Sequence, residues 1–448
     1  MPKKKTALTI EERLQQALVP AEEQPYAVPE NWVWVRLGAV CYASKEKSND
    51  FSNDIKYIGL EHLEKDKGIV GFSSADKVKS TKNAFQEGQI LYGRLRPYLN
   101  KHDIASFSGV CSTDILVFEA SVLVANVLVN KFFNLPFFIE YVVANSKGIN
   151  LPRVSEKTIL NTTFPLPPLS EQQRIVERIE ELFAKLDEAK ERLQEVADSF
   201  AVRKAAILHK AFTGELTKQW RLENGVSDES WEDKLLGDVC TVNPKKIDAK
   251  NLDDNLEVSF VPMAAVSDVL GEIVNHEVKN LQDVRTGFTN FSKGDVIFAK
   301  ITPCMENGKS AIVGPLVNDI GYGSTEFYVL RCKEELNNKY LYHMVRNTTF
   351  RAEAKAVMTG VVGQQRVPKT FLQEYQLLLP TLSEQHEIVR LIDDLLARER
   401  KAQQATEQAL ASIDLMKKSI LARAFRGELG TNKASEASAL ELLRQVLS

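Results

Sequence analysis

The chain contains one long segment twice, and this repeat limits what the chain can fold into. The first copy runs from Ser170 to Leu216 and the second from Ser383 to Leu429, with one constant offset and no gap. Each copy opens on Leu-Ser-Glu-Gln and closes on Ala-Phe-x-Gly-Glu-Leu. Both copies must therefore form the same structural element, and the fold must have room for two of them.

Each copy has the pattern of one long helix. Ser170 and Ser383 precede the apolar run and are good N-caps, because a serine hydroxyl accepts a hydrogen bond from a backbone N–H that the first turn leaves unpaired. Gly214 and Gly427 follow the last apolar turn, where a left-handed residue commonly ends a helix. We therefore predict helices that begin after these serines and end before these glycines.

The apolar residues between the caps recur at alternating spacings of four and three, which is the heptad pattern of a coiled coil. Glu399 and Thr406 interrupt this pattern in the second copy. Since one such helix cannot bury its apolar stripe alone, we predict that the two helices pack on each other, antiparallel, as a rigid spacer. The predicted seam residues are Ile175, Ile179, Leu182, Leu186, Leu193, Val196, Phe200, Ile388, Ile392, Leu395, Ile413, Met416 and Ile420.

The repeat also extends beyond the helices. Trp32 returns as Trp231, and each is followed at the same distance by Leu-Gly. Stretches with strand-like alternation return in the same order, 55–58 as 258–261 and 88–92 as 294–298. The offset drifts slowly along these stretches, which indicates small insertions in loops. We therefore predict two versions of one α+β fold, each with helical cover, around 125–145 in the first and 336–358 in the second.

The predicted organisation is domain, helix, domain, helix, with a pseudo-twofold relation between the halves. A leader precedes the first domain, a tail follows the second long helix, and a connector joins the two halves. The leader and the tail together are expected to form at one end the structure that the connector forms at the other. The predicted segments are a leader (1–31), a first domain (32–164), a central long helix (165–217), a connector (218–230), a second domain (231–379), a second long helix (380–430) and a polar tail with a short helix (431–448).

Composition narrows the class of protein. The net charge of −3 is evidence against a strongly basic coat for non-specific nucleic-acid binding, although local basic faces remain possible. No apolar run is long enough to span a membrane, and the N-terminus has no apolar run of a signal peptide. The five cysteines show no paired spacing and no zinc pattern, which favours a reducing cytoplasm.

No catalytic constellation emerges from the sequence. The six histidines do not pair at metal-ligand spacing, and there is no phosphate-binding loop of the G-x-x-x-x-G-K-[ST] type. Asp114 and Glu326 correspond between the two domains, but each is a lone carboxylate and is expected to be a turn or cap group. The sequence therefore predicts a chain that binds without catalysing and that holds no metal or cofactor of its own.

This organisation resembles the specificity subunit of type I restriction–modification systems. The resemblance rests on the doubled motifs Pro168-Leu169-Ser170-Glu171-Gln172 and Leu382-Ser383-Glu384-Gln385, which open the helices, and on the Ala-Phe-x-Gly-Glu-Leu motifs that close them. It implies two target-recognition domains that each read one half of a bipartite, asymmetric site in double-stranded DNA. It also implies that the helices dock two modification subunits, which bind S-adenosylmethionine and methylate adenine. Two restriction subunits, which use ATP and magnesium, would join them.

Candidate DNA-binding residues lie before and after one predicted strand in each domain, at 88–92 in the first domain and at 294–298 in the second. Arg94 and Lys300 correspond there, and equivalent cations after a shared strand favour a common role over a random charge, although any single Lys or Arg of this kind is more often a solvated surface residue. The candidates are Lys77, Lys79, Lys82, Asn83, Arg94, Arg96, Tyr98, Asn100 and Lys101 in the first domain, and Arg285, Thr289, Asn290, Lys300, Thr302, Asn307 and Lys309 in the second.

Arg153 and Arg366 form a further corresponding pair, just before the last strand of each domain. They are interpreted either as part of a loop that reaches DNA or the modification subunit, or as structural arginines. A second hypothesis for the whole chain is a non-catalytic coiled-coil scaffold that does not read DNA. The net charge favours it, but it gives no reason for two divergent loop sets on duplicated folds.

Overall fold

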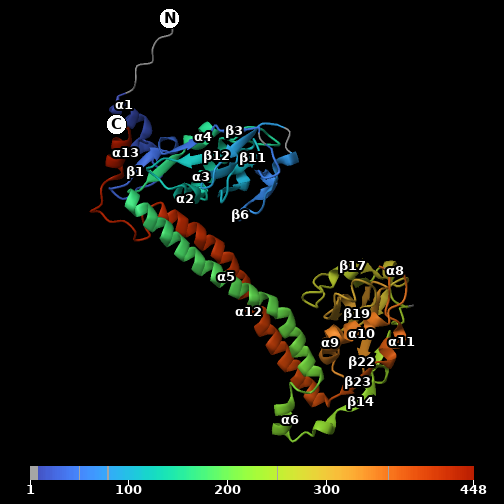
Figure 1. Ribbon diagram of the computed structural model, residues 1–448. Helices are drawn as coiled ribbons and strands as arrows, with labels where there is room; N and C mark the ends of the chain where they lie inside the picture. The colour runs from blue at the N-terminus through green and yellow to red at the C-terminus, as the bar shows by residue number, and fades with distance from the viewer. Residues whose placement is uncertain (1–8, 50, 78–79, 250, 362, 448) are drawn as a thin grey trace. The chain divides into compact units, whose positions relative to one another are not determined.

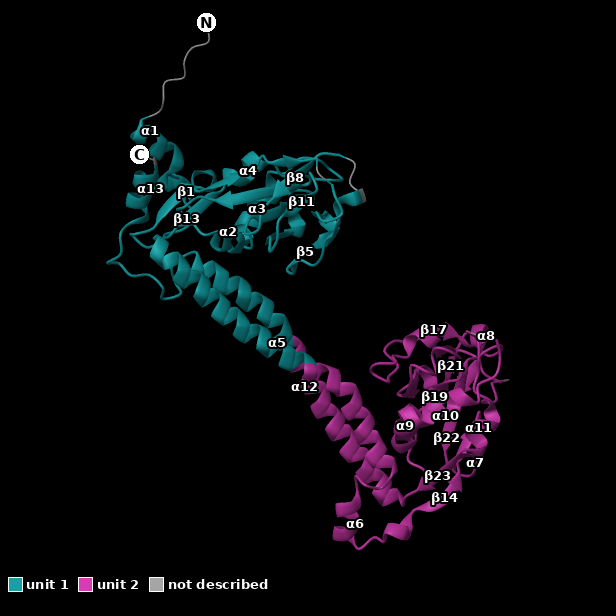
Figure 2. Ribbon diagram, in the orientation of Figure 1, with its two compact units in different colours: residues 1–194, 408–448 teal, residues 195–407 magenta. Residues whose placement is uncertain are grey.

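The computed structural model describes residues 9–49, 51–77, 80–249, 251–361 and 363–447 (Figure 1). The chain divides into two compact units (Figure 2). Unit 1 comprises Met1–Gln194 and Gln408–Ser448, and unit 2 comprises Glu195–Glu407. Each unit therefore contains one globular domain and a part of each long helix.

The domain of unit 1 is built on two main sheets. All neighbouring strands run antiparallel except β4 and β11, which are parallel. The first sheet has the order β10 (His102–Ile104), β9 (Ile90–Gly93), β12 (Ile115–Ala120), β2 (Cys41–Ala43). The second has the order β3 (Lys47–Ser48), β8 (Lys82–Phe85), β11 (Gly109–Cys111), β4 (Lys56–Ile58), β7 (Ser73–Ser74), and a hairpin of β5 (Leu63–Glu64) and β6 (Gly68–Ile69) lies outside it.

The domain of unit 2 repeats this topology. Its one parallel pair, β16 and β21, corresponds to β4 and β11. The first sheet has the order β20 (Ser310–Ile312), β19 (Val296–Ala299), β22 (Phe327–Cys332), β15 (Cys240–Val242). The second has the order β18 (Thr289–Phe291), β21 (Gly321–Gly323), β16 (Glu257–Val261), β17 (Glu277–Asn280). The prediction of two versions of one α+β fold is confirmed.

A two-stranded ribbon leads from each domain into its long helix. In unit 1 β1 (Val33–Arg36) pairs antiparallel with β13 (Thr163–Leu166), and in unit 2 β14 (Glu232–Leu235) pairs with β23 (Gln376–Leu379). Two residues separate the end of each ribbon's second strand from the first residue of the long helix. The ribbon therefore fixes how each helix leaves its domain.

The helical cover of each domain is two short helices and not the single helix that the sequence predicted. In unit 1 these are α2 (Asn126–Phe132) and α3 (Pro136–Ala144), and in unit 2 they are α9 (Asn338–Arg346) and α10 (Thr348–Ala356). Pro136 breaks the first run because proline lacks the N–H that a continuing helix needs. Asn347 breaks the second, because its extended backbone ends α9 while its side chain accepts a hydrogen bond from the Thr349 N–H at 3.0 Å.

Shorter helices complete each domain. Unit 1 has α4 (Glu156–Leu160) before its ribbon strand, and unit 2 has α11 (Lys369–Glu374) in the same place. Unit 2 also contains α6 (Lys218–Asn224), α7 (Leu236–Val239) and α8 (Leu281–Val284). Among the described residues no single helix is long and apolar enough to cross a membrane, although α2 and α3 together reach that composition across a bend of 71°.

The two long helices are α5 (Leu169–Phe212) and α12 (Leu382–Ala424). Each begins at the leucine before the predicted cap serine, so Ser170 and Ser383 lie inside the first turn. The Pro168 carbonyl accepts the first helical N–H of α5, and the Thr381 hydroxyl accepts the Glu384 N–H of α12 at 3.4 Å. Both helices end before glycines in the left-handed region, as predicted, with φ of 78° at Gly214 and 72° at Gly427.

Within each unit the parts of the two long helices pack antiparallel. In unit 1 Lys417 Nζ contacts Asp187 at 2.5 Å and Lys190 Nζ contacts Asp414 at 3.5 Å, so position increases on one helix as it decreases on the other. In unit 2 Arg203 Nε contacts Glu399 at 2.9 Å. Glu399 and Thr406, which break the apolar pattern, therefore supply polar contacts between or along the helices: the Thr406 hydroxyl, which is buried, donates to the Ala402 carbonyl at 2.9 Å.

The predicted seam residues differ in burial. Val196 and Met416 are 41% and 50% exposed, because a strict heptad drifts around a helix of about 3.6 residues per turn and leaves some positions off the contact line. Leu182, Leu186, Leu193, Leu395 and Ile420 are half-buried. The fully buried members are Ile175, Ile179, Phe200, Ile388, Ile392 and Ile413.

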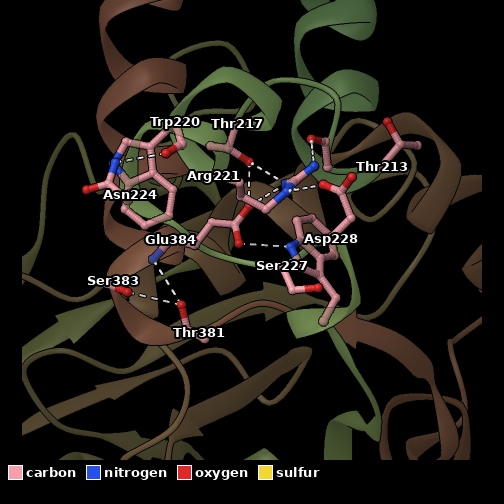
Figure 3. Close-up of polar contacts among 12 residues, drawn as sticks. Thr213, Thr217, Trp220, Arg221, Asn224, Ser227, Asp228, Thr381, Ser383 and Glu384 are labelled. Atoms are coloured by element: carbon pink, nitrogen blue, oxygen red, sulfur yellow. Dashed lines mark hydrogen bonds and ion pairs between the residues drawn. The ribbon is translucent and has the colours of Figure 1, made fainter.

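A buried glutamate joins each helix to its surroundings. In unit 2 Glu384, which is fully buried, accepts hydrogen bonds from Thr217 Oγ1 at 2.6 Å, Arg221 Nη1 at 2.6 Å and Trp231 Nε1 at 3.0 Å (Figure 3). The contacts come from the turn between α5 and α6, from α6 and from the residue before β14. One carboxylate therefore links four segments of unit 2.

Glu171 has the equivalent position in unit 1 and is also fully buried. It accepts hydrogen bonds from Trp32 Nε1 at 2.7 Å, Thr431 Oγ1 at 3.0 Å and Asn432 Nδ2 at 2.8 Å. Trp32 corresponds to Trp231, and Thr431 replaces Thr217. All three donors are neutral, whereas Glu384 is paired with the Arg221 guanidinium.

The glutamine that follows each glutamate is also buried, but its side chain bonds to backbone groups and not to other side chains. Gln172 Nε2 donates to the Leu123 and Pro167 carbonyls, and its Oε1 accepts from the Ala125 N–H. Gln385 makes the same three contacts with Glu335, Pro380 and Asn337 in unit 2. The repeated Glu-Gln motif therefore connects the start of each helix to the segment before the short cover helices.

The leader and the tail meet in unit 1. The helix α1 (Ile10–Ala17), which begins with a capping box between Thr9 and Glu12, contacts α13 (Ala439–Leu447). The Ala439 N–H donates to the Asn31 carbonyl at 2.9 Å, and Asn31 Nδ2 donates to the Lys433 carbonyl at 3.1 Å. Leader and tail together thus occupy the place in unit 1 that the 218–230 connector occupies in unit 2.

The two glutamate junctions predict unequal losses of stability. Glu384→Gln removes the buried one of the two carboxylates that pair with the Arg221 guanidinium, so we expect a loss of about 3 kcal/mol in the free energy of unfolding. Glu171→Gln weakens bonds to neutral donors only, and we expect a loss of about 1 kcal/mol. Chemical denaturation of the purified chain measures both, with Glu188→Gln, an exposed residue of α5, as a control within about 0.5 kcal/mol of the parent. Equal losses at the two glutamates would contradict this account.

Candidate nucleic-acid interface

Each domain carries a small hairpin between its cover helices and its ribbon strand. In unit 1 Lys147 pairs antiparallel with Arg153, and in unit 2 Thr359 pairs with Arg366. A glycine follows the first paired residue in both, with φ of 107° at Gly148 and 124° at Gly360. A Cβ there would lie 3.0 Å and 2.9 Å from backbone carbonyl oxygens, so both turns need a residue without a side chain.

A bidentate ion pair closes the base of each hairpin. Arg153 Nε and Nη2 lie 2.8 Å and 3.1 Å from the two carboxylate oxygens of Asp114. Arg366 Nε and Nη2 lie 2.9 Å and 2.8 Å from those of Glu326. Hydrogen bonds from these guanidiniums hold the pKa of both carboxyls below its ordinary value. The two arginines and the two carboxylates, which recur separately in the sequence, thus form two copies of one brace.

The brace is tied to the strand that carries the corresponding cations Arg94 and Lys300. The Arg94 N–H donates to the Asp114 carbonyl at 2.9 Å, and the Arg94 carbonyl accepts the Val154 N–H at 3.0 Å. Lys300 makes the same two backbone bonds with Glu326 and Val367, both at 2.9 Å. The structure therefore brings the post-strand loop, the carboxylate and the hairpin together in both domains.

Several predicted DNA-binding cations are engaged within their own domain. Lys101 Nζ donates to the Leu60 carbonyl at 2.9 Å, and Lys309 Nζ donates to the Met263 carbonyl at 3.2 Å, at equivalent places. Arg285 pairs with Asp254, Lys82 Nζ donates to Ser80 Oγ at 2.7 Å, and Lys300 Nζ lies 5.3 Å from the centre of the Tyr328 ring. The hydrogen bonds and the ion pair among these contacts hold loops onto the scaffold.

The predicted amides are largely structural. Asn290 is buried and its Nδ2 donates to the Gly321 carbonyl at 2.9 Å, while Asn83 Nδ2 donates to the Ile115 carbonyl at 2.9 Å. Asn100 is buried with a left-handed backbone, and its Nδ2 donates to the Phe133 carbonyl at 3.0 Å. Thr302 Oγ1 accepts the Gln365 N–H at 3.1 Å, and Thr289 is half-buried in β18. These side chains are therefore occupied by the fold.

The remaining candidates face solvent. Arg96 and Asn307 are exposed, and Tyr98 is 49% exposed. Arg94 is half-buried and leaves its buried Nε without a hydrogen-bond partner among the described residues. Lys79 and the side chain of Lys77 lie outside the described part of the chain. The solvent-facing group in unit 1 thus gathers on the loop that follows β9.

The apolar hairpin tips were not among the predicted DNA-binding residues, although the segments that contain them were interpreted as a loop that reaches DNA or the modification subunit. Ile149 is 99% exposed and Val361 is 71% exposed, although apolar side chains of this size are usually covered. The glycine before each tip was visible in the sequence and gave the only signal for them. Within the described residues no group of three or more His, Cys, Asp or Glu side chains is placed to hold a metal ion.

Comparison with known proteins identifies the family. The profile of the type I restriction modification DNA specificity domain matches residues 29–198 and 228–409, which is more than half of the chain and covers both domains. The chain therefore belongs to this family.

Individual relatives agree with the profile. The specificity subunit of the type I restriction enzyme EcoEI from Escherichia coli is 32% identical over 260 residues, which cover 49% of this chain and 43% of that protein. The EcoAI specificity subunit from Escherichia coli is 37% identical over 187 residues, which cover 42% of this chain and 31% of that protein. The matched part thus spans less than half the length of these two relatives.

Solved structures share the fold. The HsdS subunit from Thermoanaerobacter tengcongensis superposes with a TM-score of 0.66 at 22% identity, over 91% of this chain and 99% of that one. A chain from a study of complex assembly and conformational transition in the type I R-M system gives a TM-score of 0.68 at 21% identity, over 90% and 100%. The fold of this chain is therefore shared with these two proteins.

The brace predicts a local effect of neutralising its carboxylates. Asp114→Asn and Glu326→Gln keep the side-chain shape but remove the charge, so we expect hydrogen–deuterium exchange to rise severalfold in 147–153 and 359–367, respectively, with little change elsewhere. Because arginine lowers the folded-state pKa of both carboxyls, the protection is fully present above their unfolded pKa, about 4, and is lost as the pH falls through the lower folded value. Exchange measured at pH 7 and pH 5 in the parent chain should show equal protection, and a large loss already at pH 5 would contradict the brace.

Proposed function

We propose that this chain is the DNA-recognition subunit of a type I restriction–modification complex and is itself non-catalytic. Its two domains read the two halves of a bipartite, asymmetric target in double-stranded DNA. The observation that carries this proposal is the combination of one scaffold with two different surfaces. The sheet order, the ribbon, the brace and the glutamate junction recur, while the loops between them do not.

The differences lie where a reading surface is expected. The β5–β6 hairpin of unit 1 turns through Lys65, Asp66 and Lys67, whereas the corresponding turn of unit 2, between Val266 and Ile273, is mainly apolar at its tip. Base edges are read by side chains of specific shape and hydrogen-bonding pattern, so different side chains on one scaffold recognise different sequences. The two domains are therefore suited to two different half-sites.

The common surface suits contacts that do not depend on sequence. Arg94, Arg96 and Tyr98 lie on one loop beside the brace, with Lys300 and Asn307 at the corresponding place in unit 2. Phosphate contacts set the register of a protein on DNA and need only cations and polar donors. We assign these five residues to the DNA-facing loops, and assign Lys101, Lys309, Arg285 and the buried amides to support behind them.

The long helices provide the docking surface for partner subunits in this proposal. Two modification subunits, which bind S-adenosylmethionine, and two restriction subunits, which use ATP and magnesium, supply the chemistry. This assignment is supported by the family match and by the duplicated helices, which offer two equivalent surfaces to two copies of one partner. The whole complex acts in the cytoplasm.

The alternative is a scaffold that joins other proteins and does not read DNA, which the net charge of −3 favours. Methylation sequencing separates the two functions. DNA exposed to this chain with its modification subunit should acquire a split adenine-methylation motif that disappears when this chain is omitted. Formation of the complex without any motif would reject DNA reading and favour the scaffold.

Removing the exposed cations of the first domain should weaken DNA binding. Arg94→Ala with Arg96→Ala deletes two candidate phosphate contacts, so the slope of log K against log salt concentration should fall in magnitude by about 1 to 2. Lys45→Ala is the matched control, since this exposed cation of the same domain already pairs with Glu156. Unchanged affinity and salt slope in the complex would show that this loop does not contact DNA.

Exchanging one domain should change one half-site. A chimaera in which residues 32–164 come from a relative with a different target keeps the helices and unit 2 intact. We expect methylation sequencing to show a new first half-site beside the original second one, because each domain reads independently. A change in both halves would contradict the modular arrangement.

A further inference from the structure

The most exposed apolar side chains of the two hairpins occupy equivalent positions. Ile149 is 99% exposed at the tip of the unit 1 hairpin, and Leu151 beside it is 47% exposed. Val361 is 71% exposed at the tip of the unit 2 hairpin. Single exposed apolar side chains are common on protein surfaces, but two of them at equivalent tips of two repeated hairpins favour a shared contact surface.

These tips are held in place by the scaffold. Each is next to a glycine whose positive φ sets the turn, and each hairpin is closed by a bidentate arginine–carboxylate pair and by backbone bonds to the neighbouring loop. The Arg96 N–H donates to the Pro152 carbonyl at 2.7 Å, and the Thr302 N–H donates to the Gln365 carbonyl at 3.0 Å. The apolar tip is therefore presented in a fixed position, which lowers the entropic cost of inserting it into a partner.

The recurrence indicates a task that both domains share. The loops that differ between the domains are suited to different half-sites, but the hairpin, its glycine and its brace are the same. A feature common to two domains with different targets cannot select between those targets. It must contact something that is equivalent at both, such as the stacked base pairs of a duplex or the same surface of a partner subunit.

The surroundings of the tip favour DNA. Lys147 and Asn150 flank Ile149 and are exposed, and Arg94 and Arg96 lie on the adjoining loop. Within the described residues none of Lys147, Arg94 and Arg96 forms an ion pair. A small apolar tip, formed by Ile149 and Leu151 and bordered by cations, matches a duplex, which offers phosphates outside and apolar base faces inside.

We propose that Ile149 and Val361 are apolar wedges, each of which enters a base step beside its half-site and partly unstacks it, and that in unit 1 Lys147, Arg94 and Arg96 hold the neighbouring phosphates. This inference rests on the proposed function and adds to it a distortion of the DNA that does not depend on the bases read. The wedge deforms the duplex at one step per half-site, and steps that unstack easily would be preferred there.

The test uses the full chain in complex with its modification subunit and the target duplex found by methylation sequencing. The fluorescent base 2-aminopurine replaces single bases across and beside each half-site, but not the methylated adenines. We expect the parent complex to raise the fluorescence at one position near each half-site. Ile149→Ser should abolish the rise at one half-site and Val361→Ser at the other, and the double variant should bind the target about tenfold more weakly.

Two control variants separate the wedge from a general loss of structure. Ile149→Leu keeps an apolar tip and should keep the fluorescence rise. Val122→Ser removes another apolar side chain of unit 1, which is 80% exposed and lies away from the hairpin in sequence, and should change nothing.

The outcomes distinguish the wedge from the proposed function. If the parent complex methylates no bipartite target, the proposed function fails and the wedge with it. If it methylates its target while Ile149→Ser and Val361→Ser leave fluorescence and affinity unchanged, the wedge alone is overturned. If these variants lose the modification subunit on size-exclusion chromatography without DNA, the hairpins bind protein, which also overturns the wedge.

Discussion

The structure depends on two buried carboxylates at the starts of its long helices. A fully buried glutamate is costly unless its oxygens are hydrogen-bonded, so Glu171 and Glu384 can exist only where several donors converge on them. Those donors come from segments that are distant in sequence: a domain's first tryptophan, the threonine after the other long helix, and the connector or tail. Satisfying one carboxylate therefore forces domain entry, helix start and helix end to meet, and the same requirement is met twice.

The two junctions solve this problem differently. Glu384 is neutralised by Arg221 of the connector helix α6, whereas Glu171 relies on neutral donors from Trp32, Thr431 and Asn432. The difference follows from what each unit has available. Unit 2 has a continuous connector that can carry a cation to the site, while unit 1 must assemble the equivalent from a leader and a tail.

Much of the fold could be predicted from the sequence because it is repeated. The gapless recurrence gave both helices and their terminal glycines, and the drifting recurrence gave two domains of one fold. The start of each helix was misplaced by one residue, because the serines look like caps while the helix is in fact begun by Pro168 and Thr381. The cover helices were predicted as continuous, because apolar content cannot reveal the break at Asn347.

The candidate site was less predictable. The two arginines, Arg153 and Arg366, were recognised as a corresponding pair, and so were the two carboxylates, Asp114 and Glu326. Each arginine lies about forty positions from its carboxylate in the sequence, so only the fold shows that the two side chains bind each other. Lys101, Lys309 and Asn290 looked equally suited to DNA binding. The reason is that the residue type is the same whether a polar side chain bonds to its own domain or faces solvent. The exposure of a side chain distinguishes the supporting residues from those available to DNA, and exposure cannot be inferred from the residue type.

The meeting of leader and tail has a consequence for how the chain is made. Unit 2 is one uninterrupted stretch, so all of its contacts are available once residues 195–407 have been synthesised. Unit 1 is interrupted by the whole of unit 2, and Glu171 waits for Thr431, which lies 260 positions later. Its domain can collapse early, but the junction that anchors its helix closes only after the second domain exists. The first domain is thus synthesised before the second but stays incomplete for longer, and a chain that stops in the last part of α12, after Glu407, would contain a folded unit 2 and a unit 1 without its closing contacts.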